Sequence, residues 1–389
     1  MTLSSRRRKI CVIVNSRANY GRIKAVLGAI REHPQLELQL VAGASALLWR
    51  FGSAIDVIKA DGFRTDATVY MVLEGENPTT MAKTTGLGII ELATIFENLR
   101  PDIVLTIADR FETIAAAIAA SYMNIPVAHT QGGEITGSID ESVRHACSKL
   151  AHIHFPATEP ARRRLVAMGE EPERIFMVGC PSIDVLVRND LSLDGTFASK
   201  YGRTGVWLPV DFSKPYLIVL QHPVTTEYGR GFEQIQETLQ AVFDIGMQAV
   251  WLWPNVDAGS DDISKGLRVF REQYQPEFIH FYRNFPVEDY ARLLNNAACI
   301  VGNSSSGLRE GSYMGVPCVN IGTRQQGRDR GGNVIDVDYS AAQIREAIQS
   351  QVAHGRYPRS TLYGDGQASA RISEILSTVE VPIQKRMTY

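Results

Sequence analysis

The sequence lacks the features that mark membrane-spanning, disulfide-rich and nucleic-acid-binding proteins. No apolar run approaches the ~18 residues of a membrane span, and the run after the basic cluster Arg6–Lys9 is too short for a signal-peptide core. The five cysteines are far apart and form no CxxC pair. Because 40 Lys and Arg stand against 42 Asp and Glu, the net charge is only −2. Such a chain has no overall field to hold a nucleic-acid backbone or an anionic membrane.

These absences predict a cytoplasmic protein whose cysteines are buried free thiols, with no metal site and no nucleic-acid or membrane partner. What is present is typical of a globular protein, with 44% hydrophobic and 21% charged residues. At ~150 residues per domain, the 389 residues predict two or three domains. A chain of this length buries enough surface to fold without a disulfide or a metal.

Short β-branched runs alternate with helical patterns along the whole chain. In the first half the predicted strands are Lys9–Val14, Leu36–Val41, Asp102–Ile107, Pro126–His129 and Ile153–Pro156, and the helices are Tyr20–Arg31, Thr79–Leu99, Arg110–Met123, Ser138–Leu150 and Glu159–Met168. The pattern restarts with strands Tyr216–Gln221, Ala249–Trp253, Phe278–Tyr282, Cys299–Gly302 and Cys318–Ile321, and helices Phe232–Ile245, Asp261–Gln273, Val287–Asn295 and Ala341–Ala353. Because the strands are continuous apolar runs, we expect parallel sheets covered on both faces.

The sequence thus predicts an α/β fold with two Rossmann-like, doubly wound domains, in residues 1–187 and 188–365. The stretch 188–215 shows no clean periodicity and is interpreted as their connection. Residues 366–389 hold a last predicted helix, Gln367–Leu376, that could pack on either domain. Ligands of such sheets bind beyond the carboxyl ends of the strands, so the interdomain cleft is the expected site.

Two turns after predicted strands carry groups that suit phosphate. The segment Asn15–Arg22 feeds a helix, whose free N–H groups and positive dipole end would be joined by Arg17 and Arg22. A solvated loop is the alternative. The segment Asn15–Arg22 matches neither the dinucleotide-binding nor the ATPase sequence fingerprint. In Gln221–Thr226, His222 follows a strand and is either a core group or a phosphate partner.

Three further polar turns follow strands of the second half. The segment Gly302–Glu310 places small hydroxyl residues where backbone N–H groups can surround a phosphate, and Glu310 could accept from a ribose diol. The basic, glycine-rich segment Gly322–Asn333 fits a pyrophosphate or solvent. The third, Pro254–Ser260, is a polar turn before a helix.

Candidate acid/base groups lie in the first half. Asp109 follows a strand and is either a helix N-cap or a base at the cleft. The glycine-rich segment His129–Glu141 carries several titratable groups, and its Ser138–Glu141 end has the pattern of a capping box. Glu141 is therefore interpreted as structural, whereas Asp140 faces the loop. Several carboxylates around one loop are what proton abstraction and delivery require.

Together these stretches resemble the UDP-N-acetylglucosamine 2-epimerase family, and within it the hydrolysing branch used in sialic-acid-type and legionaminic-type sugar synthesis. The matching stretches, in family order, are Ser16–Tyr20, Ala108–Glu112, His129–Asp140, Ser142–Ala146, His222–Thr226, Pro254–Ser260, Gly302–Glu310 and Gly322–Gln325. The resemblance implies a fold like that of the GT-B glycosyltransferases, with the nucleotide mainly on the second domain. It implies elimination of a nucleoside diphosphate across C1 and C2 to a glycal-like intermediate. Water then adds at C1 while C2 is protonated on the opposite face.

The resemblance also implies partners and residue roles. The implied substrate is a nucleotide sugar, with UDP as the favoured nucleotide and GDP as the alternative. No metal or redox cofactor is expected. The resemblance also implies a homo-oligomer, either a dimer or a tetramer. Diphosphate contacts are implied for Arg17, His222, Ser304, Ser305 and Arg324, with Arg17, His222 and Arg324 as the cations, a ribose contact for Glu310, and further substrate contacts for Arg22, Arg110, His145 and Asn255. The implied catalytic set is Asp109, Glu134, Asp140, Gln131 and His129.

One position departs from the family pattern. Many members carry a glutamate two residues after His129, where this chain has Gln131, which cannot take a proton. Either Asp109 with Asp140 or Glu134 then acts as the base that removes the proton, or the substrate binds in a different orientation. Glutamine here resembles the subgroup that acts on nucleotide-linked 2,4-diacetamido-2,4,6-trideoxy sugars.

Four functions remain open at this point. A hydrolysing 2-epimerase would release a free sugar, either N-acetylmannosamine or 2,4-diacetamido-2,4,6-trideoxymannose. A non-hydrolysing UDP-N-acetylglucosamine 2-epimerase would return a nucleotide-linked epimer. A glycosyltransferase of the GT-B fold would need an acceptor. An inactive nucleotide-sugar sensor would explain Gln131, but the carboxylates Asp109, Glu134 and Asp140 argue against it.

Overall fold

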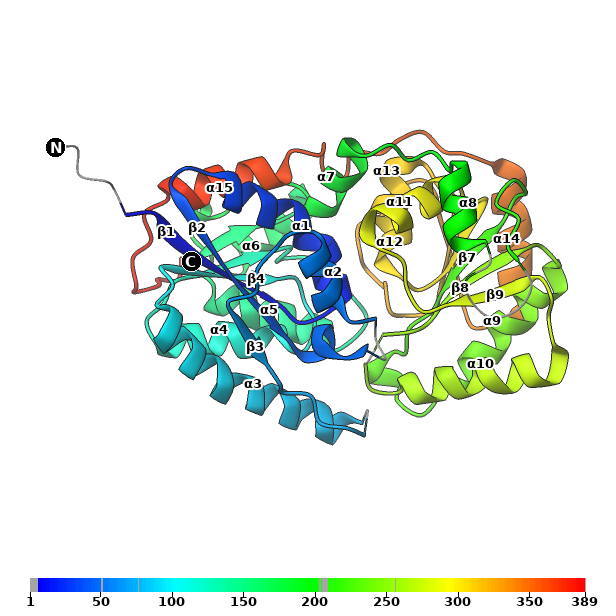
Figure 1. The fold of residues 1–389 in the computed structure, drawn as a ribbon, viewed down its shortest axis with the longest axis horizontal. Helices are drawn as coiled ribbons and strands as arrows, with labels where there is room; N and C mark the ends of the chain where they lie inside the picture. The colour runs from blue at the N-terminus through cyan, green and yellow to red at the C-terminus, as the bar shows by residue number, and fades with distance from the viewer. Residues whose placement is uncertain are drawn as a thin grey trace.

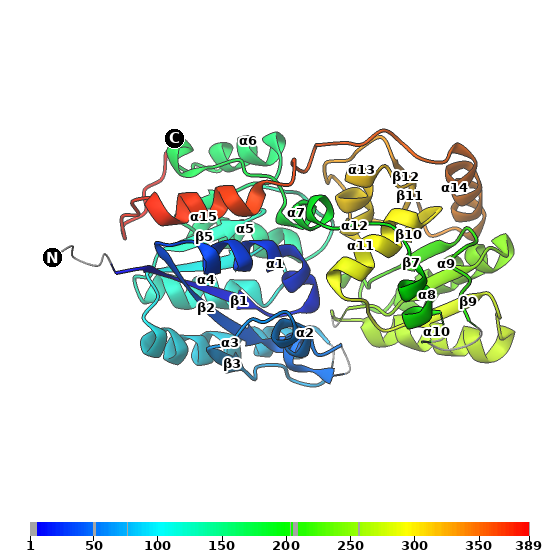
Figure 2. The same cartoon turned by 45° about the horizontal axis from the view of Figure 1, so that its top comes forward.

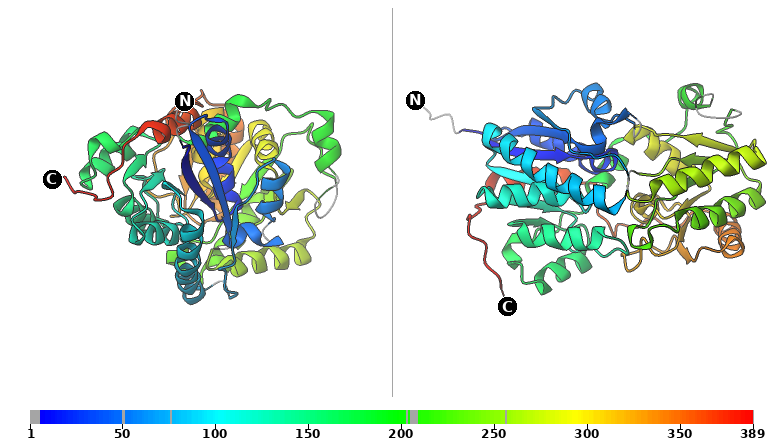
Figure 3. Two further views of the ribbon diagram at one scale, coloured as in Figure 1. Left: turned by 60° about the vertical axis from the view of Figure 1, so that its left-hand side comes forward. Right: turned by 90° about the horizontal axis from the view of Figure 1, so that it is seen from below.

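The computed structural model describes residues 6–49, 52–75, 77–202, 204, 209–255 and 257–388. Two α/β halves lie side by side along its long axis (Figure 1; Figure 3, right). Two expectations fall partly outside the described residues: position 256 within Pro254–Ser260, and positions 203 and 205–208 within the stretch 188–215.

The helices and strands follow the alternation that the sequence predicts. The first half contains β1 (Arg8–Val14), α1 (Arg17–Glu32), β2 (Leu36–Gly43), η1 (Ala44–Leu47), α2 (Ala54–Ala60), β3 (Ala67–Val69), α3 (Pro78–Leu99), β4 (Ile103–Ile107), α4 (Thr113–Tyr122), β5 (Val127–Thr130), α5 (Asp140–Leu150), β6 (Ile153–Phe155), α6 (Glu159–Ala167), η3 (Pro172–Arg174) and α7 (Pro181–Arg188). The second half contains α8 (Gly195–Tyr201), β7 (Leu217–Leu220), η4 (Thr225–Glu227), α9 (Gly231–Ile245), β8 (Ala249–Leu252), α10 (Ser260–Tyr274), β9 (Ile279–Tyr282), α11 (Val287–Asn296), β10 (Cys299–Gly302), α12 (Ser305–Leu308), α13 (Glu310–Met314), β11 (Cys318–Ile321), β12 (Val334–Val337) and α14 (Ala341–His354). Helix α15 (Ala368–Thr378) follows at the end.

Each half is built on one six-stranded parallel sheet, in the order β3-β2-β1-β4-β5-β6 and β12-β11-β10-β7-β8-β9. The prediction of two doubly wound parallel sheets is confirmed. In each half the strand order reverses beside the first strand, between β1 and β4 and between β7 and β10. The carboxyl ends at such a reversal leave a crevice for ligands.

The sequence prediction missed one strand in each sheet, β3 and β12. Each is an edge strand of three or four residues, and only Val69 among them is buried. Short, half-exposed strands lack the apolar run that identifies the central ones. The connection 188–215 also contains a helix that was not predicted, α8. Asp194 caps its first turn, because Asp194 Oδ1 accepts from the amide of Phe197 at 2.8 Å.

Alternate residues of each central strand pack against opposite helical layers. In β1, Ile10, Val12 and Val14 face one apolar cluster with α1, whereas Cys11 and Ile13 face another with α3 and α4. This two-sided burial explains why the strands are continuous apolar runs. The five cysteines are all buried and free, as expected.

The C-terminal segment returns to the first half. Helix α15 lies along α1, and the chain end lies beside α6 (Figure 2). Ile372 and Leu376 complete the apolar cluster under β1, and the amide of Thr388 donates to the carbonyl of Gly169 at 3.0 Å. Among the described residues, none of the helices is long and apolar enough to cross a membrane, and no group of His, Cys, Asp and Glu is placed to hold a metal.

Candidate active site

A cavity between the two halves collects the turns at the strand-order reversals. It contains about 1000 Å³ of atom-free space, part of it open to solvent. Its charged and polar lining consists of Arg17, Arg22, Ser182, His222, Asn255, Asn284, Tyr290, Ser304, Ser305, Ser306, Glu310 and Arg324. Most of the predicted substrate contacts are therefore brought together, although they come from turns far apart in the sequence.

The turn between β10 and α12 forms a cup of hydroxyl groups at one wall of the cavity. Ser304 is the N-cap of α12, and its Oγ accepts from the amide of Ser306 at 3.3 Å. Ser305 Oγ accepts from Arg22 Nη2 of the first half at 2.9 Å. Hydroxyl groups, backbone amides and a guanidinium thus converge, which is the donor set that holds a phosphate.

Gly302 allows β10 to end close to β7. Its φ is +128°, and a Cβ at this position would lie 2.2 Å from the carbonyl oxygen of Leu220. Any larger residue would push the serine turn away from the turn that carries His222. Glycine is therefore required for the serine turn and the turn of His222 to share one wall of the cavity.

His222 is oriented by the backbone on both sides. Its amide donates to Asn303 Oδ1 at 2.7 Å, and its Nδ1 accepts from the amide of Asn255 at 3.1 Å. The ring proton of the neutral form is therefore on Nε2. Burial, with Arg324, Arg17 and Arg110 nearby, lowers the pKa of His222 well below its ordinary value. The expectation that His222 is a cation is thus corrected: it is a neutral donor at the cavity.

Three charged residues complete the cavity wall. Arg17 Nη1 donates to the carbonyl of Arg283 across the halves at 3.0 Å, and burial lowers the pKa of Arg17 to about 10, so it stays charged at neutral pH. Arg324 donates to the carbonyl of Asn303 at 3.2 Å. The Oε2 atom of Glu310 is buried and lacks a hydrogen-bond partner among the described residues. Such an orphaned acceptor fits a ligand that brings hydroxyl donors.

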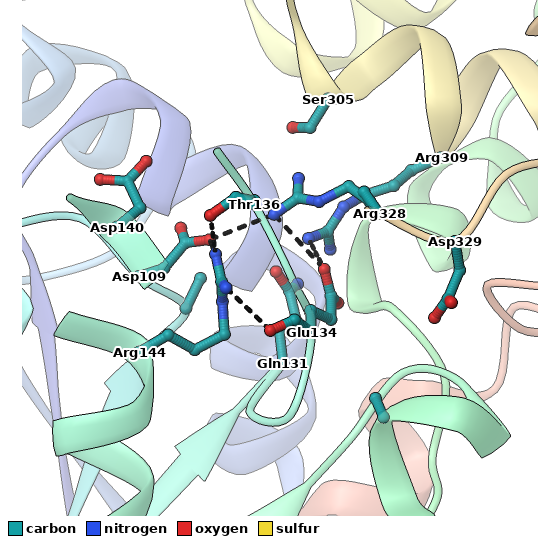
Figure 4. Close-up of polar contacts among 12 residues, drawn as sticks. Asp109, Gln131, Glu134, Thr136, Asp140, Arg144, Ser305, Arg309, Arg328 and Asp329 are labelled. Atoms are coloured by element: carbon teal, nitrogen blue, oxygen red, sulfur yellow. Dashed lines mark hydrogen bonds and ion pairs between the residues drawn. The ribbon is translucent and has the colours of Figure 1, made fainter. Parts of the chain in front are cut away.

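Asp109 is the centre of a buried ionic cluster (Figure 4). Its carboxylate pairs with Arg144, with Arg22 at 3.4 Å and with Arg328 at 3.3 Å. Burial alone raises the pKa of Asp109, but the three guanidinium groups outweigh it and hold the pKa well below the ordinary value. Asp109 is therefore ionised at neutral pH. It does not cap a helix, since α4 begins at Thr113.

His129 does not line the cavity; it contacts the backbone beside Asp109. Its Nε2 donates to the carbonyl of Ala108 at 2.7 Å, and its Nδ1 accepts from Ser148 Oγ at 3.2 Å. Burial lowers the pKa of His129 to about 4, so the ring is neutral. Ala108 has a φ of +53°, a strained conformation for a residue with a Cβ. The bond from His129 fixes this turn and thereby aims the neighbouring Asp109.

Asp140 has the opposite electrostatic environment. It lies in the first turn of α5, beside Asp109 in Figure 4, and its Oδ2 is 3.7 Å from Arg324 Nη2. Burial, with the negative charges of Asp109 and Asp257, raises the pKa of Asp140 to about 6 despite Arg324 and Arg110. Two neighbouring carboxyl groups whose pKa values are pushed apart are a common acid/base arrangement.

The loop before α5 differs from the predicted capping box. The helix begins at Asp140 with Ile139 at the N-cap position, and Ser138 Oγ accepts from the amide of Asp140 at 3.3 Å. Glu141 instead accepts from the amide of Thr136 at 2.7 Å and from Arg144 at 2.8 Å. It remains structural, as expected, but it holds the loop rather than the helix end.

Glu134 and Gln131 are buried on that same loop. Glu134 Oε2 is 2.5 Å from Arg309 Nη2 and 3.5 Å from Arg328 Nη2, both in the second half. Gln131 Nε2 donates to Cys180 Sγ at 3.3 Å. The remaining oxygens, Glu134 Oε1 and Gln131 Oε1, are buried without a partner in the described chain.

Three predicted substrate contacts lie elsewhere or act through the backbone. His145 Nε2 and Glu141 Oε1 are 2.8 Å apart, and His145 is not among the residues that line the cavity described above. Arg110 pairs with Asp257 across the halves at 2.9 Å and with Glu112 at 3.1 Å. Asn255 lines the cavity, and its amide orients His222.

Sequence reasoning gave no role to Arg144, Arg309 or Arg328, although each lies in a segment that it singled out. Arg144 is fully buried and joins Asp109 to the loop through Thr136 Oγ1 at 3.0 Å and the carbonyl of Glu134 at 2.9 Å. A weak signal existed: Arg144 and Ser148 are polar residues four apart beside the apolar positions of α5. For Arg309 and Arg328 the partners lie in the other half, so no local pattern identifies them.

Comparisons with known proteins agree with this arrangement. The sequence pattern of the family described as UDP-N-acetylglucosamine 2-epimerase matches residues 28–377. The UDP-N,N'-diacetylbacillosamine 2-epimerase (hydrolyzing) of Legionella pneumophila is 34% identical over 386 residues, covering 97% of this chain and 97% of that protein. The UDP-N-acetylglucosamine 2-epimerase of Neisseria meningitidis serogroup B is 31% identical over 385 residues, covering 97% and 98%.

A solved structure shares the fold. The UDP-GlcNAc 2-epimerase of Methanocaldococcus jannaschii, in complex with UDP-GlcNAc and UDP, superposes with a TM-score of 0.78 at 17% identity, covering 95% of this chain and 99% of that chain. At this identity the likeness concerns the fold alone. It places the two doubly wound halves in a GT-B-like arrangement.

Proposed function

This chain belongs to the UDP-N-acetylglucosamine 2-epimerase family, and from that premise we propose that it is a hydrolysing nucleotide-sugar 2-epimerase. The observation that carries the proposal is the pairing of two sites. The phosphate-suited cup is linked to two carboxyl groups of the first half whose pKa values differ, Asp109 and Asp140, neither of which lines the cavity itself. Arg22 contacts both Ser305 and Asp109, and Arg324 of the cavity wall lies 3.7 Å from Asp140. Departure of a diphosphate and movement of a proton are the two events that such an arrangement serves.

The preferred substrate that we propose is a UDP-linked 2,4-diacetamido-2,4,6-trideoxyglucose. Two findings support it: the Legionella relative carries this activity in its name, and Gln131 stands where many members have glutamate. The product would be UDP and free 2,4-diacetamido-2,4,6-trideoxymannose, for use in legionaminic-type acid synthesis. We further propose a cytoplasmic homo-oligomer.

The proposed reaction has two steps. A carboxylate takes the C2 proton while the C1–O bond breaks, so that the electron pair of C2–H forms the C1–C2 double bond and UDP leaves. Water then adds its oxygen to C1, and a proton arrives at C2 on the opposite face. The first step needs stabilisation of the leaving diphosphate, which preorganised donors supply at ~3–4 kcal/mol each.

Each proposed role rests on the geometry of its group. Arg17, Arg324, neutral His222 and the cup of Ser304 and Ser305 would hold the diphosphate. The orphaned Glu310 Oε2 would accept from the ribose diol.

Among the carboxyl groups, we assign Asp140 as the base. With a pKa of about 6 it is ionised at neutral pH yet remains close to the best value for proton transfer. Asp109 stays ionised and raises the pKa of Asp140. Glu134, with its free Oε1, would serve the opposite face of the sugar.

A substrate screen tests the proposed function. Purified protein would be incubated with UDP-linked and GDP-linked diacetamido-trideoxyglucose and with UDP-N-acetylglucosamine, and the products separated by chromatography. We expect free UDP and a free 2-epimeric sugar, most rapidly from the UDP-linked diacetamido sugar. A nucleotide-linked epimer without UDP release would indicate a non-hydrolysing enzyme, turnover only with an acceptor a glycosyltransferase, and binding without turnover a sensor.

A further inference from the structure

One short segment of the second half faces two sites at once. Helices α12 and α13 meet at Arg309, and the residues around this junction, Ser305 and Glu310, line the nucleotide-suited cavity. Arg309 itself does not line it. Its side chain is 1% exposed and enters the ionic cluster of the first half (Figure 4).

Tyr363 and Cys180 contact the guanidinium of Arg309 beside that cluster. Its guanidinium lies 5.3 Å from the ring centre of Tyr363, and its Nη1 donates to Cys180 Sγ at 3.4 Å. Tyr363 is itself fixed by a 2.7 Å bond from its hydroxyl to the carbonyl of Asp329. The other terminal nitrogen, Nη2, ends 2.5 Å from Glu134 Oε2.

Glu134 depends on the second half for its orientation. In the described part of the chain, the ion pairs of its carboxylate come from Arg309 and, more distantly, from Arg328. One carboxylate oxygen of Glu134 is thus held, and the other, Oε1, is buried without a hydrogen-bond partner among the described residues.

We propose that Arg309 is a positioning residue that couples occupancy of the nucleotide cavity to the orientation of Glu134. A nucleoside diphosphate that contacts the serine cup and Glu310 immobilises the junction of α12 and α13. Arg309 is then fixed in the position that holds Glu134 toward the sugar. The proposal rests on the proposed function for its catalytic meaning, but the coupling itself involves nucleotide binding alone.

Hydrogen exchange with UDP as the probe tests the coupling without turnover. UDP should protect two segments of the wild-type chain: residues 220–226 at the cavity and residues 131–136 around Glu134. In Arg309→Met, protection of 220–226 should persist, and UDP affinity should stay within about twofold because Arg309 does not line the cavity. Protection of 131–136 should be lost. Equal protection of 131–136 in both proteins would overturn the proposal.

Two variants control for a general loss of structure. Arg309→Lys keeps the charge but not the forked contact, and we expect partial protection of 131–136 even where Arg309→Met folds poorly. Arg359→Met removes a guanidinium that lies on Tyr313 at 4.7 Å, much as Arg309 lies on Tyr363, without reaching Glu134. It should behave as wild type. An effect of Arg359→Met equal to that of Arg309→Met would contradict a specific role.

A double-mutant cycle tests the catalytic meaning. Misplacing a catalytic group by about 1 Å costs ~100-fold in rate, so Arg309→Met should lower kcat by about that factor and leave KM within about threefold. In a Glu134→Gln background the same change should have almost no further effect. An undiminished effect in that background would overturn positioning through Glu134. If the wild type fails to turn over any nucleotide sugar, the proposed function fails while the exchange result still decides the coupling.

Discussion

Replacing Asp109 with asparagine should lower both kcat and stability, with one of the two largest effects that the structure predicts. The change keeps the shape of the side chain but leaves Arg144, Arg22 and Arg328 without their shared counter-charge. Removing one partner of a buried ion pair costs about 3–5 kcal/mol. The loss of negative charge also removes one of the groups that raise the pKa of Asp140, so the base weakens. We expect kcat to fall by ~100-fold or more.

Thermal unfolding and steady-state kinetics measure the two effects separately. Asp244→Asn serves as the matched control, because Asp244 also pairs with an arginine, Arg345 at 3.4 Å, but on the surface. Exposed pairs contribute about 0–1 kcal/mol, so the control should melt and turn over as wild type. Unchanged turnover in Asp109→Asn would remove Asp109 from the mechanism.

Asp140→Asn should remove the acid limb of the pH profile together with most of the activity. The folded protein raises the pKa of Asp140 to about 6, so the group is protonated below that pH and ionised above it. A base works only when ionised, and kcat/KM should therefore fall about tenfold per pH unit as the pH drops below 6. The variant should lose ~10²–10⁴-fold at pH 7.5 and show no limb near pH 6.

The same raised pKa has a consequence for stability with a definite sign. Between the ordinary value of 3.8 and about 6, the folded state binds a proton at Asp140 that the unfolded state has released. This group therefore contributes stability at low pH that is lost as the pH rises through about 6. Asp261→Asn, an exposed position in the first turn of α10, is the control. For activity, a wild-type kcat/KM that falls rather than rises between pH 5 and 7 would make Asp140 an acid instead of a base.

Much of the fold follows from local sequence patterns. Apolar runs such as Ile10–Val14 give buried parallel strands because both faces are covered, and the polar turns after them give the cavity wall. The edge strands β3 and β12 escaped prediction because they are short and half-exposed. Helix α15 could not be assigned to a half, since only tertiary packing shows Ile372 and Leu376 under β1.

The site was predictable to the extent that its groups follow strands. Arg17, His222, Ser305 and Arg324 were found in this way. What the sequence could not provide is the environment that sets their chemistry. The neutral state of His222 depends on burial and three surrounding arginines. The pKa of Asp109 is lowered by arginines from segments far apart in the chain, and that of Asp140 is raised by burial and by the charge of Asp109. Arg309 and Arg328 act across the two halves, a contact that no local pattern contains.

The central claim, elimination across C1 and C2 followed by water addition, is tested most directly by solvent labelling. The protein would be incubated with UDP-linked diacetamido-trideoxyglucose in deuterated water, and the free sugar examined by NMR and mass spectrometry. We expect one deuterium at C2 of the released 2-epimer, with stoichiometric UDP. A released sugar that keeps its original hydrogen at C2 would contradict it.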